Sequence, residues 1–171
     1  MDITQIILDQ HHEQRQLFAF IREVDPADHE SLSALWDRLS GLLDAHAEGE
    51  ERFFYPRLLK KGRGAADADS AADETRDAIK DHNDIRDTAS AVGKQKIGSD
   101  KWFAAVVEAD IANSKHMAEE ERQGLSDFRS NATIDERHSL GVKFLAFVSG
   151  HLLGVPPVDK DPDTYVKDHQ G

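Results

Sequence analysis

The stretch "HAEGEERFFYP", residues 46–56, indicates an internal repeat, because its opening phrase returns seventy residues later in "HMAEEERQGLS", residues 116–126. Both stretches place a histidine, three further residues and then Glu-Glu-Arg. Residues four apart in sequence lie one turn apart on the same face of an α-helix. Each stretch therefore predicts a helix that turns a histidine and a glutamate toward one point in space, His46 with Glu50 and His116 with Glu120.

A second phrase completes an internal repeat. "HHEQRQ" begins at His11 and "HNDIRD" begins at His82, and each has an arginine four residues after its first histidine. The histidines His11, His46, His82 and His116 are separated by 35, 36 and 34 residues. The chain is therefore interpreted as two helical hairpins of the same plan, each offering one histidine and then one histidine with a glutamate.

The rest of the chain favours an all-α fold. Helix-forming residues dominate, prolines stand at the expected joints, and no segment alternates convincingly as a strand does. We expect helices over about residues 2–24, 28–60, 70–92, 100–130 and 133–153, with Pro56 kinking or weakening the end of the second. Short joints between the first four predict an antiparallel up-and-down four-helix bundle.

We expect the chain to consist of two parts. Residues 1–130 form the bundle, and residues 131–171 add a fifth helix and a tail rich in Pro and Asp. Thr133 and Glu136 have the spacing of a capping box at the start of the fifth helix. Leu140, Phe144, Phe147 and Val148 are available to pack it on the outside of the bundle. The tail is expected either to be loose or to lie along the bundle as an extended strap.

Composition narrows the classes of function. The 171-residue chain has no cysteine, which excludes disulfides, thiolate metal sites, iron–sulfur ligation and cysteine nucleophiles. Its formal net charge of −12 disfavours nucleic acid and anionic membrane surfaces as partners. No signal peptide and no apolar run of membrane-spanning length is apparent, so a cytoplasmic location is expected.

The repeated histidines fall on the helix faces that should point inward. His46 and Glu50 continue a line of apolar side chains at steps of three and four, and a buried carboxylate is costly unless it is paired or bound to a metal. The apolar positions on that line are Leu32, Leu35, Leu39, Leu42 and Phe53. His11 lies in line with Ile7 and Phe18 in the same way, and His82 lies in line with Ile85.

The fourth helix is less regular. Val106, Ala109 and Asn113 align with His116 and Glu120, but a second apolar line passes through Phe103, Val107 and Leu125.

Together these positions predict a metal site. Imidazole and carboxylate donors without sulfur suit iron, manganese or zinc, and bundle cores with Glu and His at helical spacing hold two metals. The expected ligands are His11, His46, Glu50, His82, His116 and Glu120. Each metal is expected to receive two histidines, with the two carboxylates free to bridge and coordination positions left for a small molecule.

Neighbouring residues leave some alternatives open. A single core histidine is more often structural than a ligand, and the metal interpretation depends on the repetition over four helices. His12 remains an alternative to His11, and Glu121 to Glu120. The other histidines, His29, His138, His151 and His169, are interpreted as structural or solvated. Glu51, Glu119, Arg15, Arg86 and Tyr55 are candidates for the rim of the site.

These phrases resemble the hemerythrin-type HHE cation-binding domain. The matching residues are "HHEQRQLF", "HAEGEERFFYP", "DHNDIRD" and "HMAEEER", in this order, over about residues 3–128. The resemblance implies a non-haem di-iron centre in a four-helix bundle. It carries the metal ligands over to the same six residues, with Glu50 and Glu120 as bridging carboxylates.

Two departures bear on the implied function. Oxygen-carrying hemerythrins have a further histidine where this chain has Ala78, and an aspartate where it has Glu121. The pattern here resembles bacterial and regulatory branches that include iron–sulfur-cluster repair, nitric-oxide-responsive and peroxide-decomposing proteins. The repair proteins usually carry an additional region with cysteines, and this chain has none, which counts against that role.

The resemblance therefore implies a di-iron protein that binds or reacts with O2, NO or peroxide in sensing or detoxification, with or without enzymatic turnover. A redox partner protein is compatible with this role. The alternative is an iron storage or sensing module in which metal occupancy controls the order of the bundle. A third hypothesis is an interaction protein in which the site is a relic.

Overall fold

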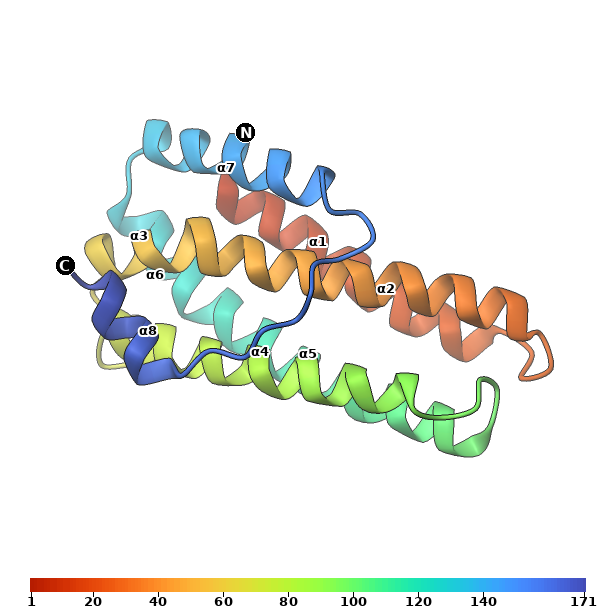
Figure 1. The fold of residues 1–171 in the computed structure, drawn as a ribbon. Helices are drawn as coiled ribbons and strands as arrows, with labels where there is room; N and C mark the ends of the chain where they lie inside the picture. The colour runs from red at the N-terminus through yellow and green to blue at the C-terminus, as the bar shows by residue number, and fades with distance from the viewer.

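Four long helices form an up-and-down bundle in the computed structural model, which describes residues 1–171 and contains no strand. They are α1 (Ile3–Glu23), α2 (His29–Gly49), α4 (Ala71–Gly93) and α5 (Asp100–Arg122). In Figure 1 the α1–α2 hairpin lies above the α4–α5 hairpin, and the four axes run roughly along one direction. The all-α bundle expected from the sequence is confirmed.

Each long helix begins at a side-chain cap. Asp2 accepts a hydrogen bond from the N–H of Thr4, and Asp28 accepts one from Ser31. Ser70 and Ser99 cap α4 and α5 in the same way. Such caps satisfy backbone donors that a helix start leaves free, so the starts of these helices were readable from the sequence.

The expected second helix is interrupted before its proline. Residues Glu50–Phe54 form a π-helix, η1, between α2 and α3 (Tyr55–Lys61). The N–H of Tyr55 donates to the carbonyl of Glu50, five residues back. Pro56 has no N–H to offer to the next carbonyl in this register, that of Glu51. The expected kink at Pro56 is therefore a widened turn that starts at Glu50, and π-turns of this kind often occur at functional sites.

The expected fourth helix is also divided. α5 ends at Arg122, and after Gln123 the chain continues as α6 (Gly124–Asn131). A Cβ atom at Gly124 would lie 3.3 Å from the Leu58 side chain and 3.5 Å from the Phe54 ring. The absence of a side chain at Gly124 thus allows α6 to approach η1 and α3 closely.

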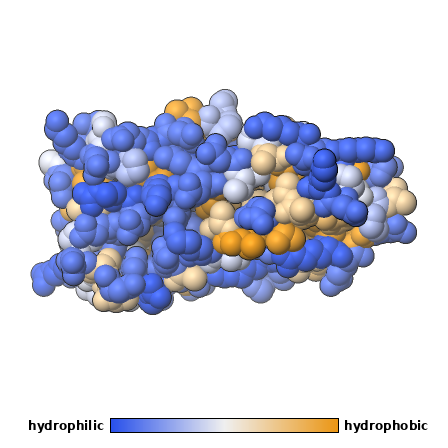
Figure 2. Space-filling view, turned by 90° about the horizontal axis from the view of Figure 1, so that it is seen from below, coloured by the Kyte–Doolittle hydropathy of each residue, from blue (hydrophilic) through white to orange (hydrophobic).

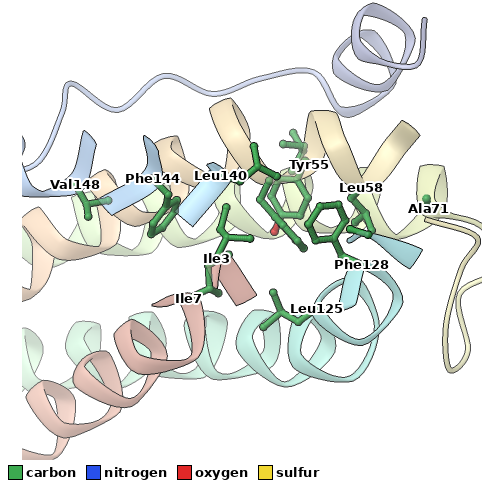
Figure 3. Packing of buried hydrophobic residues seen from close by; sticks show 14 of the residues in the cluster. Ile3, Ile7, Tyr55, Leu58, Ala71, Leu125, Phe128, Leu140, Phe144 and Val148 are labelled. Atoms are coloured by element: carbon green, nitrogen blue, oxygen red, sulfur yellow. The ribbon is translucent and has the colours of Figure 1, made fainter. Parts of the chain in front are cut away.

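Helix α7 (Ile134–Ser149) covers the α1–α2 hairpin. Its capping box of Thr133 and Glu136 is present. Leu140, Phe144 and Val148 are buried in one hydrophobic cluster with Ile3 and Ile7, as Figure 3 shows. The expected packing of this helix on the outside of the bundle agrees with these contacts, although it ends at Ser149 rather than near residue 153.

The tail is partly helical. Residues 150–161 cross from α7 over α2 to α4, and α8 (Pro162–His169) then packs near α4 and α3 (Figure 1). Asp161 caps α8 by accepting a hydrogen bond from the N–H of Thr164. An Asp-Pro pair is a local signal for a helix start, which the sequence interpretation as a loose tail or extended strap did not use.

The surface is mainly polar. Figure 2 shows a largely hydrophilic face with a small group of hydrophobic side chains near its middle. No helix combines the length and the apolar composition needed to cross a membrane.

Two acidic side chains fasten the loop between α3 and α4. Glu74 accepts a hydrogen bond from the N–H of Ala65 at 2.7 Å. Asp127 accepts from the N–H groups of Arg63 and Gly64, at 2.7 and 2.9 Å. Burial, together with the neighbouring charge of Asp127, raises the pKa of Glu74 to about 8.

Replacing Phe144 tests the packing of α7. The ring is fully buried, so we expect Phe144→Ala to lower the free energy of unfolding by about 3–5 kcal/mol. Val142 on the same helix is 46% exposed, and Val142→Ala should change it by less than about 0.5 kcal/mol. Urea denaturation of both variants measures this, and equal effects would show that α7 does not depend on its buried face.

Glu74 should make stability depend on pH. Because its pKa in the folded protein lies above that of an exposed glutamate, the folded state binds the extra proton, and stability falls as pH rises from about 4.5 to about 8. Glu74→Gln removes this contribution. Over that pH range the free energy of unfolding should therefore fall more in wild type than in the variant, by a difference of more than ~1.4 kcal/mol. Parallel pH profiles of urea midpoints in the two proteins would contradict the assignment.

Candidate metal centre

The six predicted ligands meet in the middle of the bundle, between the two hydrophobic clusters of the core. None is more than 5% exposed. They are His11 on α1, His46 on α2, Glu50 at the start of η1, His82 on α4, and His116 and Glu120 on α5. His12 is exposed, and Glu121 lies beside the site rather than in its centre.

The histidines form two pairs. Nε2 of His11 lies 3.2 Å from Nε2 of His46, and Nε2 of His82 lies 3.2 Å from Nε2 of His116. Zinc–nitrogen bonds in proteins are ~2.1 Å long. Two nitrogens bound to one ion at this distance, with an angle of about 100° at the ion, would also lie about 3.2 Å from each other. Each pair is thus spaced as two ligands of one cation.

Glu50 lies between the two pairs. Its Oε1 is 2.9 Å from Nε2 of His46, and its Oε2 is 3.2 Å from Nε2 of His82. Glu120 faces one pair only, with Oε2 at 3.3 Å from Nε2 of His11. The other oxygen of Glu120 accepts a hydrogen bond from the hydroxyl of Tyr55 at 2.5 Å.

These contacts define two donor sets that share one residue. The four-donor set is His11, His46, Glu50 and Glu120, and the three-donor set is Glu50, His82 and His116. Only the Glu50 carboxylate belongs to both sets. Glu120, which the resemblance implied as a second bridge, faces the four-donor set because Tyr55 occupies its other oxygen.

The unpaired atoms of the site fit bound cations. Both oxygens of Glu50 and Oε2 of Glu120 are buried without a hydrogen bond of acceptable geometry. A buried carboxylate without a partner is strongly disfavoured. A cation in each donor set would satisfy these oxygens, and nitrogen and oxygen donors without sulfur suit iron, manganese or zinc. The residues present therefore fit the pair of metals that the sequence predicts.

The second glutamate of each repeated phrase orients a histidine of the other hairpin. Nδ1 of His11 donates to Glu121 at 2.9 Å, and Nδ1 of His82 donates to Glu51 at 2.7 Å. An acceptor on Nδ1 fixes the tautomer and turns Nε2 toward the metal position. The sequence placed Glu51 at the rim of the site and left Glu121 as an alternative to the ligand Glu120, and the structure gives each a specific histidine.

The repeated arginines complete these interactions. Arg15 donates to Glu121, and Arg86 donates to Glu51, each at 2.7 Å. HxxxR and the histidine and two glutamates of HxxxEER thus form one arrangement that occurs twice. The closing arginines of HxxxEER, Arg52 and Arg122, pair elsewhere, with Glu48 and Asp67.

His46 is oriented by a residue that sequence reasoning did not single out. Its Nδ1 donates to Oε1 of Gln10 at 2.8 Å. Gln10 stands just before His11, and Asp81 holds the equivalent place before His82. Asp81 instead accepts from Lys115 at 2.7 Å. Because the two residues differ in type and partner, the repeat gave no signal for this contact.

Charge within the site is balanced by the histidines. Burial alone lowers the pKa of His11, but the neighbouring carboxylates of Glu120 and Glu121 outweigh it and raise the pKa to about 9. His82 behaves alike, with a pKa of about 9 set by Glu50 and Glu51 against the effect of burial. Burial and the charge of His82 hold the pKa of His116 well below its usual value. A cation at the site would take the place of protons on these rings.

A narrow pocket between α4 and α5 reaches the site. Its volume of about 10 Å³ is room for roughly one water molecule. It touches Tyr55, His116 and Glu120, and four acidic side chains also line it. These acidic side chains are Glu74, Asp77, Asp81 and Glu119. Among them, the exposed Asp77 and the half-buried Glu119 carry negative charge that favours the approach of cations.

The remaining histidines lie outside both donor sets. Nδ1 of His138, His151 and His169 contacts the backbone carbonyls of Met1, Phe147 and Tyr165, respectively. His29 is exposed at the start of α2.

Comparisons with known proteins agree with this architecture. The structure is similar to the crystal structure of a hemerythrin HHE cation binding domain-containing protein from Mycobacterium kansasii, with a TM-score of 0.74 and 21% sequence identity over 89% of this chain and 88% of that chain. At this identity the likeness supports the fold alone. No curated protein matches the chain. The family model for the hemerythrin HHE cation binding domain matches residues 2–126, and the chain therefore belongs to this family.

Proposed function

We propose that the buried site holds two iron ions and that O2, NO or peroxide binds or reacts there, in sensing or detoxification. One observation carries the proposal: Glu50 turns one oxygen toward each histidine pair, and neither oxygen has a hydrogen-bond partner. Membership of a cation-binding family supports the same interpretation.

The two donor sets assign the ligands. His11, His46 and Glu120 would hold one iron, and His82 and His116 the other, with Glu50 contributing an oxygen to each. When bound, the iron pair would supply Lewis acidity and electron exchange to a small ligand. The three-donor set has more coordination positions free, and the pocket between α4 and α5 reaches its His116. We therefore assign ligand binding to this side of the centre.

Residues of the chain prepare that position. Burial, followed by the charges of Glu120 and Glu50, raises the pKa of Tyr55 well above its usual value, so its hydroxyl stays protonated. That hydroxyl donates to Glu120 and lines the pocket, so it holds a proton within the site. The surrounding helices keep bulk water away because every donor residue is buried.

A second candidate function is iron storage or sensing without catalysis. The unpaired oxygens of Glu50 and Glu120 favour it, because metal binding that satisfies buried groups also stabilises the fold. In this case metal occupancy would control how well the bundle is ordered. The two candidates share the site and differ in whether the bound metals turn over a substrate.

The composition of the chain supports proposals about its location and its partners. The absence of cysteine is the basis for proposing a cytoplasmic location, and the net charge of −12 for proposing no nucleic-acid partner. We treat residues 131–171 as an addition to the bundle of residues 1–130, because α7 and α8 pack directly on it.

Iron content tests the site directly. After anaerobic loading with ferrous iron and desalting, we expect about two irons per chain. Glu50→Gln removes the charge shared by both donor sets, so its iron content should fall below one per chain. His12→Ala is the matched control because His12 neighbours a ligand but is exposed. Near-zero iron in wild type, or two irons in Glu50→Gln, would contradict the proposal.

Metal removal should destabilise the protein. Ferrous iron at about 100 times its dissociation constant adds about 2.7 kcal/mol to stability. For a chain of this size the melting temperature should rise by roughly 5–10 °C relative to the chelator-treated protein. Calorimetry under anaerobic conditions measures the shift, and Glu50→Gln should show little of it. Equal melting temperatures would contradict metal-coupled stability.

Turnover separates the two candidate functions. Oxygen evolution from peroxide, measured on the iron-loaded protein, should exceed that of an equal amount of free iron if the site is enzymatic. Full iron content and a melting shift without such excess would favour storage or sensing, or binding of O2 or NO without turnover.

A further inference from the structure

The C-terminal strap, residues 150–171, contacts the metal centre through one residue, Glu51. Lys160 pairs with a carboxylate oxygen of Glu51 and also donates to Glu48 at 2.8 Å. The hydroxyl of Tyr165 donates to the backbone carbonyl of Glu51. That carbonyl is the one to which Pro56 offers no N–H in the π-helical register. The strap thus fixes both the side chain and the backbone of Glu51.

The position of the strap is itself fixed beside the site. Asn83, which follows His82, donates to the carbonyl of Lys160 at 2.8 Å and accepts from its N–H at 3.1 Å. Arg76 on α4 also pairs with Asp163 on α8 at 2.7 Å. These contacts place Lys160 and Tyr165 directly over η1 and α4.

Glu51 is the acceptor that orients His82. Its side chain is fully buried and contacts three positive or proton-donating groups, on His82, Arg86 and Lys160. The hydrogen bonds from His82 and Arg86, each at 2.7 Å, and the contact with Lys160 compensate the burial of its charge. Charge-assisted hydrogen bonds are strong, and in a buried setting they hold a side chain in one orientation.

Glu121, the equivalent glutamate in the second hairpin, lacks the buried cation contacts that hold Glu51. Glu121 orients His11, but its side chain is 30% exposed and its cation, Arg15, is 42% exposed. Interactions at this exposure are weakened by water and salt. The two halves of the site therefore have the same plan in sequence but different support in the structure.

We propose that Lys160 and Tyr165 are positioning residues for the three-donor set alone, and that the strap makes the two metal positions inequivalent. The inference rests on the proposed metal site. The set of Glu50, His82 and His116 has one protein donor fewer than the other set, and the strap holds the outer partner of one of its two histidines. Loss of an outer partner of a metal-bound histidine typically lowers metal affinity 10–100-fold.

A cobalt titration of the full chain tests this. Co2+ stands in for Fe2+, and calorimetry with visible absorption follows each binding event without relying on activity. Wild type should bind two ions. Lys160→Met keeps most of the side-chain length but removes the charge, and Tyr165→Phe removes only the hydroxyl. Each should weaken one event by about 10–100-fold and leave the other unchanged.

Matched variants assign the affected event. Lys167→Met makes the same charge change on an exposed part of α8 and should change neither event. His82→Ala should abolish the event that Lys160→Met weakens, and Glu121→Gln should weaken the other event. Circular dichroism of each variant checks the fold, and Tyr165→Phe remains informative if Lys160→Met is unstable.

The outcomes separate the two proposals. Suppose that wild type binds two ions, and that Lys160→Met and Tyr165→Phe either change neither event or weaken both events by the same factor. This result would overturn the role of the strap but not the metal site. No binding by wild type would overturn the proposed function, and the inference with it.

Discussion

Glu50 lies fully buried in the middle of the bundle, with one carboxylate oxygen turned toward each histidine pair. A carboxylate that is fully buried in the middle of a helical bundle is unstable unless positive groups surround it. Protonated His11 and His82 supply positive charge near it when no metal is bound, and the histidine rings of four helices lie between two hydrophobic clusters. The widened turn of η1 begins at this residue. The fold thus surrounds a carboxylate whose charge would be unstable in a purely hydrophobic core.

The repeated phrase is a compact solution to this constraint. In each hairpin the first glutamate points into the site, and the second crosses to the other hairpin, where it orients a histidine. The arginine one turn after that histidine then neutralises the second glutamate. The two hairpins are therefore joined by charged contacts as well as by apolar packing, and neither can orient its own first histidine. This reciprocity is a physical reason for the duplication of the phrase.

Sequence periodicity predicted the inward residues because an α-helix fixes which side chains share a face. It favoured His11 over the exposed His12, and it identified Glu50 and Glu120. Features that depend on distant partners were not predictable in this way. Pro56 indicated a disturbance, but the π-turn at Glu50 depends on the local backbone register. The contact of Gln10 with His46 and the strap contacts at Glu51 join residues more than thirty positions apart, where periodicity carries no information.

The additions after the bundle cover its two hairpins unequally. Phe144 of α7 lies against His46, with ring centroids 6.1 Å apart, and the strap covers Glu51. Helix α7 closes the surface around the first hairpin, and the strap runs over η1 onto α4. The pocket that reaches His116 lies between α4 and α5, where neither addition stands in the way. A duplicated cage is open to ligands from two equivalent sides unless something covers one of them. Helix α7 provides that cover on the first hairpin, so a small ligand of the proposed metal pair would reach it through the pocket beside His116.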